Sequence, residues 1–155
     1  MNRLHPRVRL IWIGRSVLTS ALLAGAVFGV GRFFRPAWLP SWAPIAVFGV
    51  LATLGVTFAI LRYRSWRWEV REDSLYLERG VLTHVRTVVP FVRIQHVDTA
   101  RSPIQRFLGL ASTVVYTAGS RGADVSVPGL EVGGADDLRE RLKRLAIRSE
   151  GEDAV

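Results

Sequence analysis

The sequence predicts a two-helix transmembrane hairpin followed by a small, mainly β sandwich or open barrel that is closed by a C-terminal α-helix. Three observations support this fold class. Two long apolar segments lie in the first half of the 155-residue chain, no acidic residue precedes Glu69, and from residue 67 onward the apolar residues recur at every second position. The second half mixes charges of both signs, so the two halves are suited to different solvents.

The first apolar segment, about residues 16–34, is long enough for a membrane-spanning helix. Its uncharged core extends for about 24 Å, and the flanking Arg15 and Arg32 can reach the interfaces of a hydrocarbon layer roughly 30 Å thick. Gly25 and Gly29 form a Gly-x-x-x-Gly pair within it, which either supports helix association or has no role.

The second apolar segment, about residues 44–61, extends for about 27 Å and is flanked by Trp42 and Trp66, whose side chains suit the headgroup layer. The prolines of residues 32–43 predict a short turn between the helices. Because arginines are concentrated before the first helix and after the second, both termini are predicted to be cytoplasmic in a multi-pass protein of the cell membrane. The expected organisation is a basic cytoplasmic N-terminus, a hairpin, a cytoplasmic β-rich domain and a flexible tail, at residues 1–15, 16–61, 62–148 and 149–155.

Two other interpretations of the apolar segments are less favourable. A cleaved signal peptide would explain the basic start and the small residues at positions 24–26, but the apolar stretch continues past that point. A buried helical hairpin in a soluble protein would need more polar chain around it than the second half provides.

Turn-forming residues divide the second half into strands. Alternation on both sides of "REDS" (residues 71–74) predicts a hairpin, and Gly80 marks the next turn or bulge. Pro90 should break or bend the run at residues 83–99 because it cannot donate to a ladder. Two further strands are expected at residues 112–119 and 123–130, joined through "GSRG" at 119–122.

The last predicted element is an amphipathic helix within residues 134–148. Leu138, Leu142 and Leu145 form its apolar stripe, and acidic residues precede basic ones along it, which suits the helix macrodipole. We expect this helix to cover a sheet.

The segment "PFVRIQHVDTARSPIQRFLG", residues 90–109, combines a strand pattern with a helix start. Alternation places Val92, Ile94 and His96 on one side of the strand, and Ser102 can cap a short helix that begins at Pro103 and stops at Gly109. The segment is therefore predicted to be structural.

With two N-terminal membrane helices, the motifs "RIQHV", "SPIQRFLGL" and "TAG" and a "VPGL" that precedes an acidic helix start, the chain resembles the bacterial pleckstrin-homology (PH) membrane proteins of the YdbS-like type. The resemblance covers nearly the whole chain. It implies a PH-like sandwich with a C-terminal helix at the inner face of the cytoplasmic membrane and no established catalytic activity. It also implies a membrane complex, in which a longer relative with several such domains is a partner.

The residues carry little pattern typical of catalysis. Cysteine is absent, His96 has only Asp98 close in sequence, and His5 and His84 offer no ligand spacing with it. We therefore expect no enzyme activity, no catalytic residues, no cofactor and no metal. Nucleic-acid binding is not expected despite the charge of +8, because the tryptophans lie at the predicted membrane borders.

The leading hypothesis is a non-enzymatic membrane protein whose PH-like domain binds other membrane or cell-envelope proteins, including a longer relative or a second copy of itself. The alternative is a module that binds anionic lipid headgroups. Its candidate contact residues, which are equally compatible with a structural role, are Arg93, Gln95, Arg101 and Arg106. The juxtamembrane basic residues are Arg62, Arg64 and Arg67.

Overall fold

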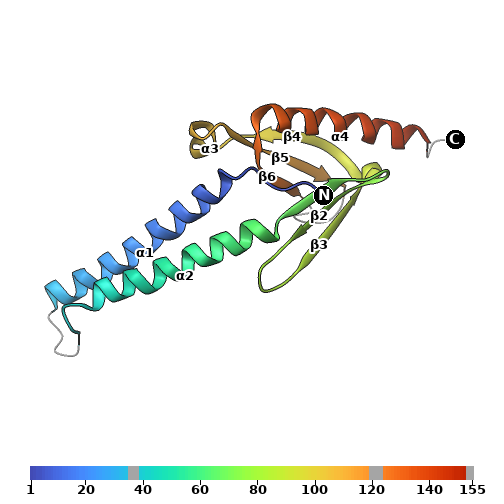
Figure 1. Ribbon diagram of the computed structural model, residues 1–155. Helices are drawn as coiled ribbons and strands as arrows, with labels where there is room; N and C mark the ends of the chain where they lie inside the picture. The colour runs from blue at the N-terminus through green and yellow to red at the C-terminus, as the bar shows by residue number, and fades with distance from the viewer. Residues whose placement is uncertain (35–38, 119–123, 153–155) are drawn as a thin grey trace. The chain divides into compact units, whose positions relative to one another are not determined.

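Two long helices form the first part of the computed structural model, which describes residues 1–34, 39–118 and 124–152. Helices α1 (Val8–Phe33) and α2 (Ala43–Ser65) are long and apolar enough to cross a membrane (Figure 1). Both extend beyond the predicted uncharged segments, because arginine is a good helix former and does not end a helix. Arg35, Pro36 and Trp38 of the predicted turn lie outside the described residues.

The two helices of the hairpin approach each other closely at Gly55, where a Cβ atom would lie 2.9 Å from the Cβ of Ser16. At Gly25 and Gly29 a Cβ atom would meet nothing within 4 Å in the described part of the chain. The hydroxyls of Ser16 and Ser20 donate to carbonyls four residues earlier, at 3.0 and 2.8 Å. These polar groups are therefore satisfied inside their own helix, as a hydrocarbon environment requires.

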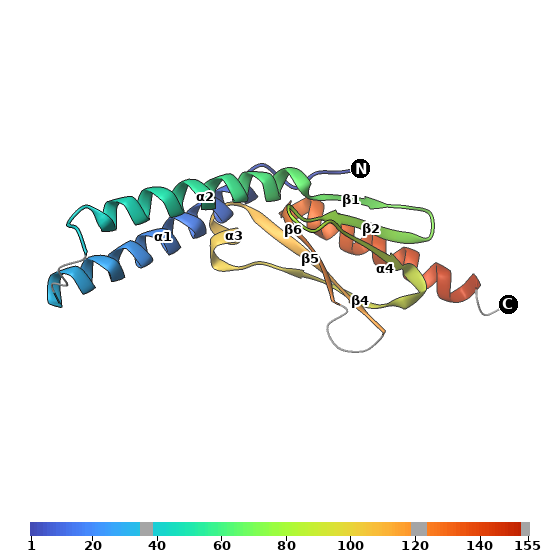
Figure 2. The same ribbon diagram turned by 90° about the horizontal axis from the view of Figure 1, so that it is seen from below.

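In the described part of the chain, two three-stranded antiparallel sheets and a C-terminal helix follow the hairpin, which confirms the predicted fold class (Figures 1 and 2). The sheet orders are β1-β2-β3 and β4-β5-β6. The strands are β1 (Arg67–Val70), β2 (Ser74–Arg79), β3 (Val85–Pro90), β4 (Ile94–Ala100), β5 (Leu110–Thr117) and β6 (Val125–Glu131). The 3-10 turn η1 (Phe91–Arg93) joins β3 to β4, and helix α3 (Pro103–Phe107) joins β4 to β5.

Gly80, Pro90 and Ser102 mark the ends of strands and the start of a helix, as predicted from the sequence. Gly80 follows β2 with φ +126°, and a Cβ atom there would lie 1.8 Å from the carbonyl oxygen of Thr83, so glycine is required. Pro90 ends β3. Ser102 accepts a hydrogen bond from the backbone N–H of Gln105 and its own N–H donates to the Gln105 side chain, which forms a capping box at α3. The predicted "GSRG" connection lies outside the described residues.

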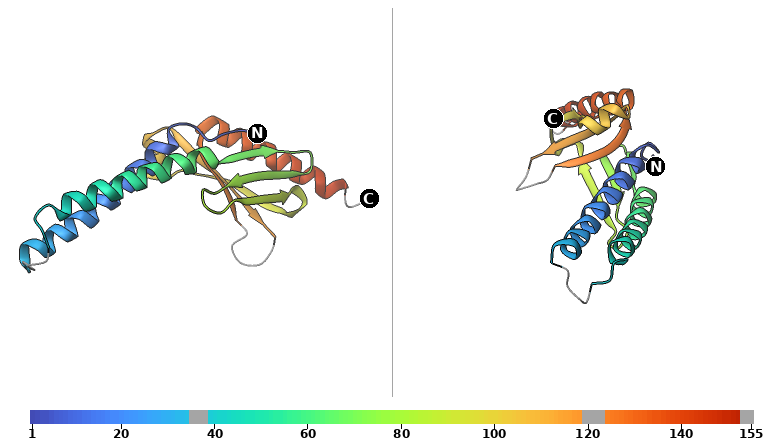
Figure 3. Two further views of the ribbon diagram at one scale, coloured as in Figure 1. Left: turned by 60° about the horizontal axis from the view of Figure 1, so that its bottom comes forward. Right: turned by 90° about the vertical axis from the view of Figure 1, so that its left-hand side faces the viewer.

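Helix α4 (Val132–Glu152) packs against η1, β4 and β5 and lies along the second sheet (Figure 3). Its buried side chains are Ala135, Leu138, Leu142 and Ala146. Leu145 of the predicted stripe is only half-buried, because the burial follows a spacing of three and four residues from Ala135. The helix continues through Glu152, so residues 149–152 of the expected flexible tail are helical, and residues 153–155 are not described.

The N-terminal segment is part of the β-rich fold, a feature that sequence reasoning missed. Met1–Val8 and Ser65–Val155 form one unit, called the β domain below. Leu4 and Val8 are 2% and 1% exposed, Asn2 pairs with Trp68 in β1, and the His5 N–H donates to the Gly129 carbonyl in β6 at 2.8 Å. Residues 2–5 therefore bridge an edge strand of each sheet.

Trp66 also belongs to the core of the β domain. It is 4% exposed, and the guanidinium of Arg79 lies 5.8 Å from its ring. Trp66 was expected to present its ring to the headgroup layer; the ring is instead enclosed by protein.

Candidate functional site

A groove of about 500 Å³ lies between β4 and α4 and is called the β4–α4 groove below. Its apolar floor includes Ile94 and Ala146, which are 5% and 8% exposed. Ile147, at 61% exposed, adds an apolar side chain to the rim. The lining residues are Ile94, Gln95, His96 and Val97 from β4 and Arg139, Glu140, Lys143, Ala146 and Ile147 from α4.

A β-bulge determines which side chains of β4 are exposed. The register with β5 shifts between Ile94 and His96. Gln95 and His96 are consequently both exposed, whereas Ile94 is buried and Val97 is half-buried. The predicted alternation, which placed His96 on the side of Ile94 and Val92, is therefore wrong, because a bulge reverses the faces of the residues that follow it.

The exposed His96 makes aromatic and polar contacts with its neighbours. Its ring stacks on Tyr116 with centroids 4.1 Å apart and an interplanar angle of 14°. Its Nε2 lies 3.9 Å from the carboxylate of Asp98, and both side chains are more than half exposed. Over the described residues, no three His, Cys, Asp or Glu side chains are grouped to hold a metal ion. The geometry around His96 is that of a surface contact.

The rim of the groove on α4 carries a basic excess. Arg139 pairs with Glu140 through Nη2 and Oε1 at 3.3 Å. Lys143 adds a further positive charge to the same rim. An acidic side chain of a ligand would therefore be attracted to the Lys143 end of this surface.

The predicted contact residues do not form one cluster. Gln95 lines the β4–α4 groove. Arg93 precedes β4, whereas Arg101 and Arg106 follow it. The seven residues of β4 extend for roughly 23 Å between its two ends. Nε of Arg101 donates to the Leu110 carbonyl at 3.4 Å, which is a contact within the domain. Arg93 and Arg106 are exposed.

The juxtamembrane arginines occupy two different elements. Arg62 and Arg64 lie in the last turn of α2, and the guanidinium of Arg62 lies 4.7 Å from the ring centroid of Trp12. Arg67 begins β1, where its cross-strand partner is Glu78. Opposite charges at such a pair support the strand register.

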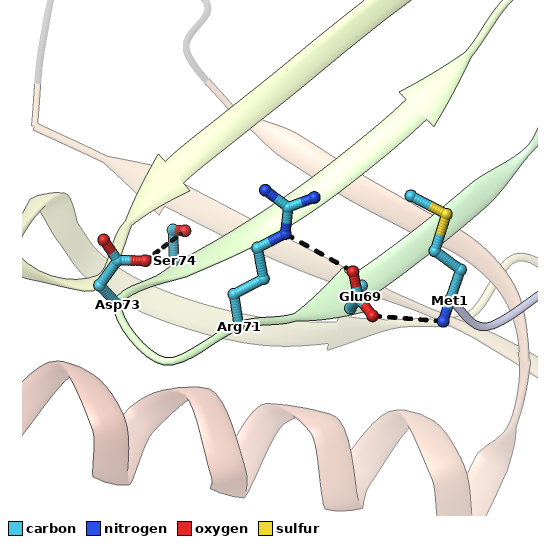
Figure 4. Close-up of polar contacts among 5 residues, drawn as sticks. All are labelled: Met1, Glu69, Arg71, Asp73 and Ser74. Atoms are coloured by element: carbon cyan, nitrogen blue, oxygen red, sulfur yellow. Dashed lines mark hydrogen bonds and ion pairs between the residues drawn. The ribbon is translucent and has the colours of Figure 1, made fainter.

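Glu69 connects the N-terminus to β1 (Figure 4). One carboxylate oxygen lies 3.3 Å from the Met1 ammonium and the other 3.5 Å from Nε of Arg71. The hydrogen bond from the N-terminus, followed by its charge and then by Arg71, lowers the pKa of the Glu69 carboxyl below its ordinary value. Sequence reasoning could not find this contact, because it depends on the N-terminal segment lying against β1. The neighbouring Ser74 hydroxyl donates to Asp73 at 2.8 Å in the turn that follows (Figure 4).

Comparison with known proteins identifies the family. Residues 13–146 match the family described as Bacterial PH domain. The chain belongs to this family. This bacterial PH domain protein is 33% identical over 154 residues to the UPF0699 transmembrane protein YdbS of Bacillus subtilis (strain 168), an alignment that covers 94% of the chain and 92% of YdbS. It is 26% identical over 106 residues to the UPF0699 transmembrane protein YdbT of the same organism, covering 67% of the chain and 22% of YdbT. No solved structure matches significantly.

These relatives confirm the resemblance that the motifs carry. The bacterial PH domain protein is a membrane protein with transmembrane helices, and its family is not typical of enzymes. The family match begins at residue 13, so the bridging residues 2–5 lie outside it. The groove residues Ile94–Ala146 lie inside the match, whereas the N-terminal bridge is a feature of this chain's own structure.

Proposed function

We propose that this chain is a non-enzymatic membrane protein that holds its PH-like domain at the cytoplasmic face of the cell membrane and docks a segment of another membrane or cell-envelope protein in the β4–α4 groove. The observation that carries the proposal is the groove, which combines an apolar floor and a basic rim with an edge strand. A family that is not typical of enzymes supports the non-enzymatic part.

The proposed cytoplasmic position of the PH-like domain is supported by the two ends of the hairpin, which both lead into that domain. Val8, at the start of α1, and Ser65, at the end of α2, belong to the same β domain. A hairpin that returns to one domain crosses the membrane an even number of times, and the arginines outside the turn favour the cytoplasmic side. Cleavage as a signal peptide would remove Leu4 and Val8, which are almost fully buried.

Binding of an extended segment is the mode that the groove favours. β4 is an edge strand of its sheet, so one row of its backbone N–H and C=O groups has no partner strand among the described residues. An extended chain can pair with such an edge by β-augmentation. One of its side chains would contact the apolar floor at Ile94 and Ala146, and an acidic residue would lie near Lys143.

A longer relative of this family is the class of partner that we propose. YdbT matches this chain over only 22% of its own length, so the relatives include a much longer transmembrane protein. Such a partner would share the bilayer with this chain, which raises the effective concentration of its segments at the groove. Self-association is the alternative outcome of the same experiment.

In-cell photo-cross-linking tests the proposal on the full chain. A photoreactive amino acid at position 147, on the rim of the groove, should cross-link to a membrane protein that mass spectrometry identifies after detergent purification. Lys143→Glu should abolish this product. Arg144→Glu is the matched control, since Arg144 is the next residue on α4, is basic and exposed, and does not line the groove.

Four outcomes decide between the hypotheses. Loss of the product in Lys143→Glu alone supports docking in the groove. Equal losses in both variants, or cross-links to lipid only, would refute it. A product that contains only this chain would replace the longer partner with a second copy.

The headgroup-binding alternative has weaker support at the predicted arginines. Arg93 and Arg106 lie beyond opposite ends of β4, a strand whose seven residues extend for roughly 23 Å, so one headgroup is not expected to contact both. Vesicle binding that is lost in both Arg93→Ala and Arg106→Ala, with the fold unchanged, would nevertheless restore this alternative.

A further inference from the structure

Two large apolar side chains of the β domain are almost fully exposed. Leu82, in the turn of residues 80–84 between β2 and β3, is 90% exposed. Phe107, the last residue of α3, is 91% exposed. Single exposed apolar residues are common on soluble surfaces, so their position in the domain decides whether they have a role.

The β2–β3 turn lies at the end of the β domain that contains Ser65 and Trp66. Arg67 at the start of β1 pairs with Glu78 near the end of β2. Because β1 and β2 are antiparallel, the end of β2 lies beside the start of β1. The β2–β3 turn, which follows β2, therefore lies at the same end of the sheet as Ser65 and Trp66, which precede β1. The guanidinium of Arg79, the last residue of β2, lies 5.8 Å from the Trp66 ring, so the turn that follows lies near Trp66.

Helix α3 is tied to the other junction. Nη1 of Arg7 donates to the Leu108 carbonyl at 3.3 Å, directly after α3. The next residue, Val8, is 1% exposed in the β domain and is the first residue of α1. Within the β domain, α3 and the β2–β3 turn lie toward the same end (Figures 1 and 2).

The membrane surface lies within a short distance of these junctions along the chain. The uncharged part of α2 ends at Leu61, and the four residues to Ser65 extend for about 6 Å as a helix. The headgroup layer on each side of a bilayer is about 5–8 Å thick. Residues beside Ser65 and Trp66 are therefore expected at the outer boundary of this layer.

Basic side chains accompany both exposed residues. Arg79 and Arg86 border the β2–β3 turn, although Arg86 also pairs with Glu78 at 3.5 Å. Arg106 directly precedes Phe107, and Arg101 precedes α3. An apolar side chain next to arginines is typical of segments that enter the interface of an anionic bilayer.

We propose that the β2–β3 turn and α3 insert Leu82 and Phe107 into the headgroup layer of the membrane that the hairpin spans. The neighbouring arginines contact anionic headgroups at the same surface. The β domain thus rests on the bilayer at two points in addition to its covalent anchor. This surface is separate from the β4–α4 groove, so it does not depend on the docking function proposed above.

The absence of cysteine from the chain allows a direct test. Single cysteines at positions 82 and 107 of the full chain are labelled with an environment-sensitive fluorophore and reconstituted into phosphatidylcholine vesicles with and without phosphatidylglycerol. Glu72→Cys is the control, because Glu72 is exposed in the turn between β1 and β2, at the opposite end of β2. Leu82→Cys and Phe107→Cys remove exposed side chains, so the fold should be retained.

The proposal predicts a blue-shifted emission at positions 82 and 107 that lipids with nitroxide-labelled acyl chains quench, and a water-like, unquenched emission at position 72. Phosphatidylglycerol should increase the shift. Equal emission at all three positions would overturn the proposal. A blue shift without quenching by labelled lipid would also overturn it, since it would indicate burial against protein.

Discussion

The substitution Leu4→Ala is expected to destabilise the β domain strongly, although Leu4 precedes the helical hairpin in sequence and the strands of the domain follow it. Leu4 is 2% exposed and lies between the contacts of residues 2 and 5 with the two sheets. Truncation of a buried leucine costs about 2–5 kcal/mol. A segment near a chain end can relax toward the cavity, so the lower part of this range, about 2–3 kcal/mol, is expected.

Thermal denaturation of the full-length protein in detergent measures the effect. For a domain of about 100 residues, each kcal/mol lowers Tm by about 4–8 °C, so Leu4→Ala should lower it by about 8–24 °C. Tryptophan fluorescence is a suitable signal because the buried Trp66 becomes exposed on unfolding.

Leu10→Ala provides the matched control. It makes the same substitution six residues later, at a side chain that is 54% exposed, and should change the stability of the β domain by less than about 0.5 kcal/mol. Equal Tm values for Leu4→Ala and Leu10→Ala would show that the N-terminal segment is a free tail, and would refute the reasoning.

Three further predictions concern the same domain. Gly129→Ala should lower the stability of the domain by more than about 1 kcal/mol, because Gly129 has φ +64° and a Cβ atom there would lie 2.5 Å from the Cβ of Val8. In thermal denaturation, the loss caused by Gly129→Ala should be smaller in a Val8→Gly background. Strictly additive losses would contradict the contact between the two residues. The Glu69 carboxyl, whose pKa is lowered in the folded state mainly by the N-terminal ammonium, should stabilise the domain above its ordinary pKa of 4.5, and this contribution should disappear as the pH falls through the lower folded pKa. Glu69→Gln should therefore reduce the dependence of Tm on acid pH, and an unchanged dependence would contradict the pairing. Ser102→Ala should cost about 1 kcal/mol in urea denaturation by removing the cap of α3, whereas no change would show that the capping box contributes little.

Local sequence signals predicted most of the fold. Alternation around residues 71–74, the glycine at position 80 and the proline at position 90 act within a few residues, and each marks the boundary of a strand in the structure. The same holds for the capping box at Ser102. Such features are readable because the physical cause and its effect lie close together along the chain.

The candidate site was less accessible to sequence reasoning because it depends on contacts between distant elements. Gln95 was a candidate contact residue because of its place in the strand pattern, and the structure places it in the lining of the β4–α4 groove. Lys143 and Ile147 line the same groove from α4, but the helix pattern alone does not mark them as contact residues. The bulge at Ile94 and His96 has no glycine or proline to mark it, so the exposed face of β4 was assigned wrongly.

The N-terminal bridge has a consequence for how the molecule must assemble. Residues 2–5 precede the hairpin in sequence, yet their partners Trp68 and Gly129 follow it. Closing such distant contacts is slow, because a long intervening chain must first be ordered. Formation of the helical hairpin inside the bilayer would shorten the distance between Val8 and Ser65 before the sheets form. Membrane insertion is therefore expected to precede and accelerate closure of the β domain, so that the anchor contributes to folding as well as to location.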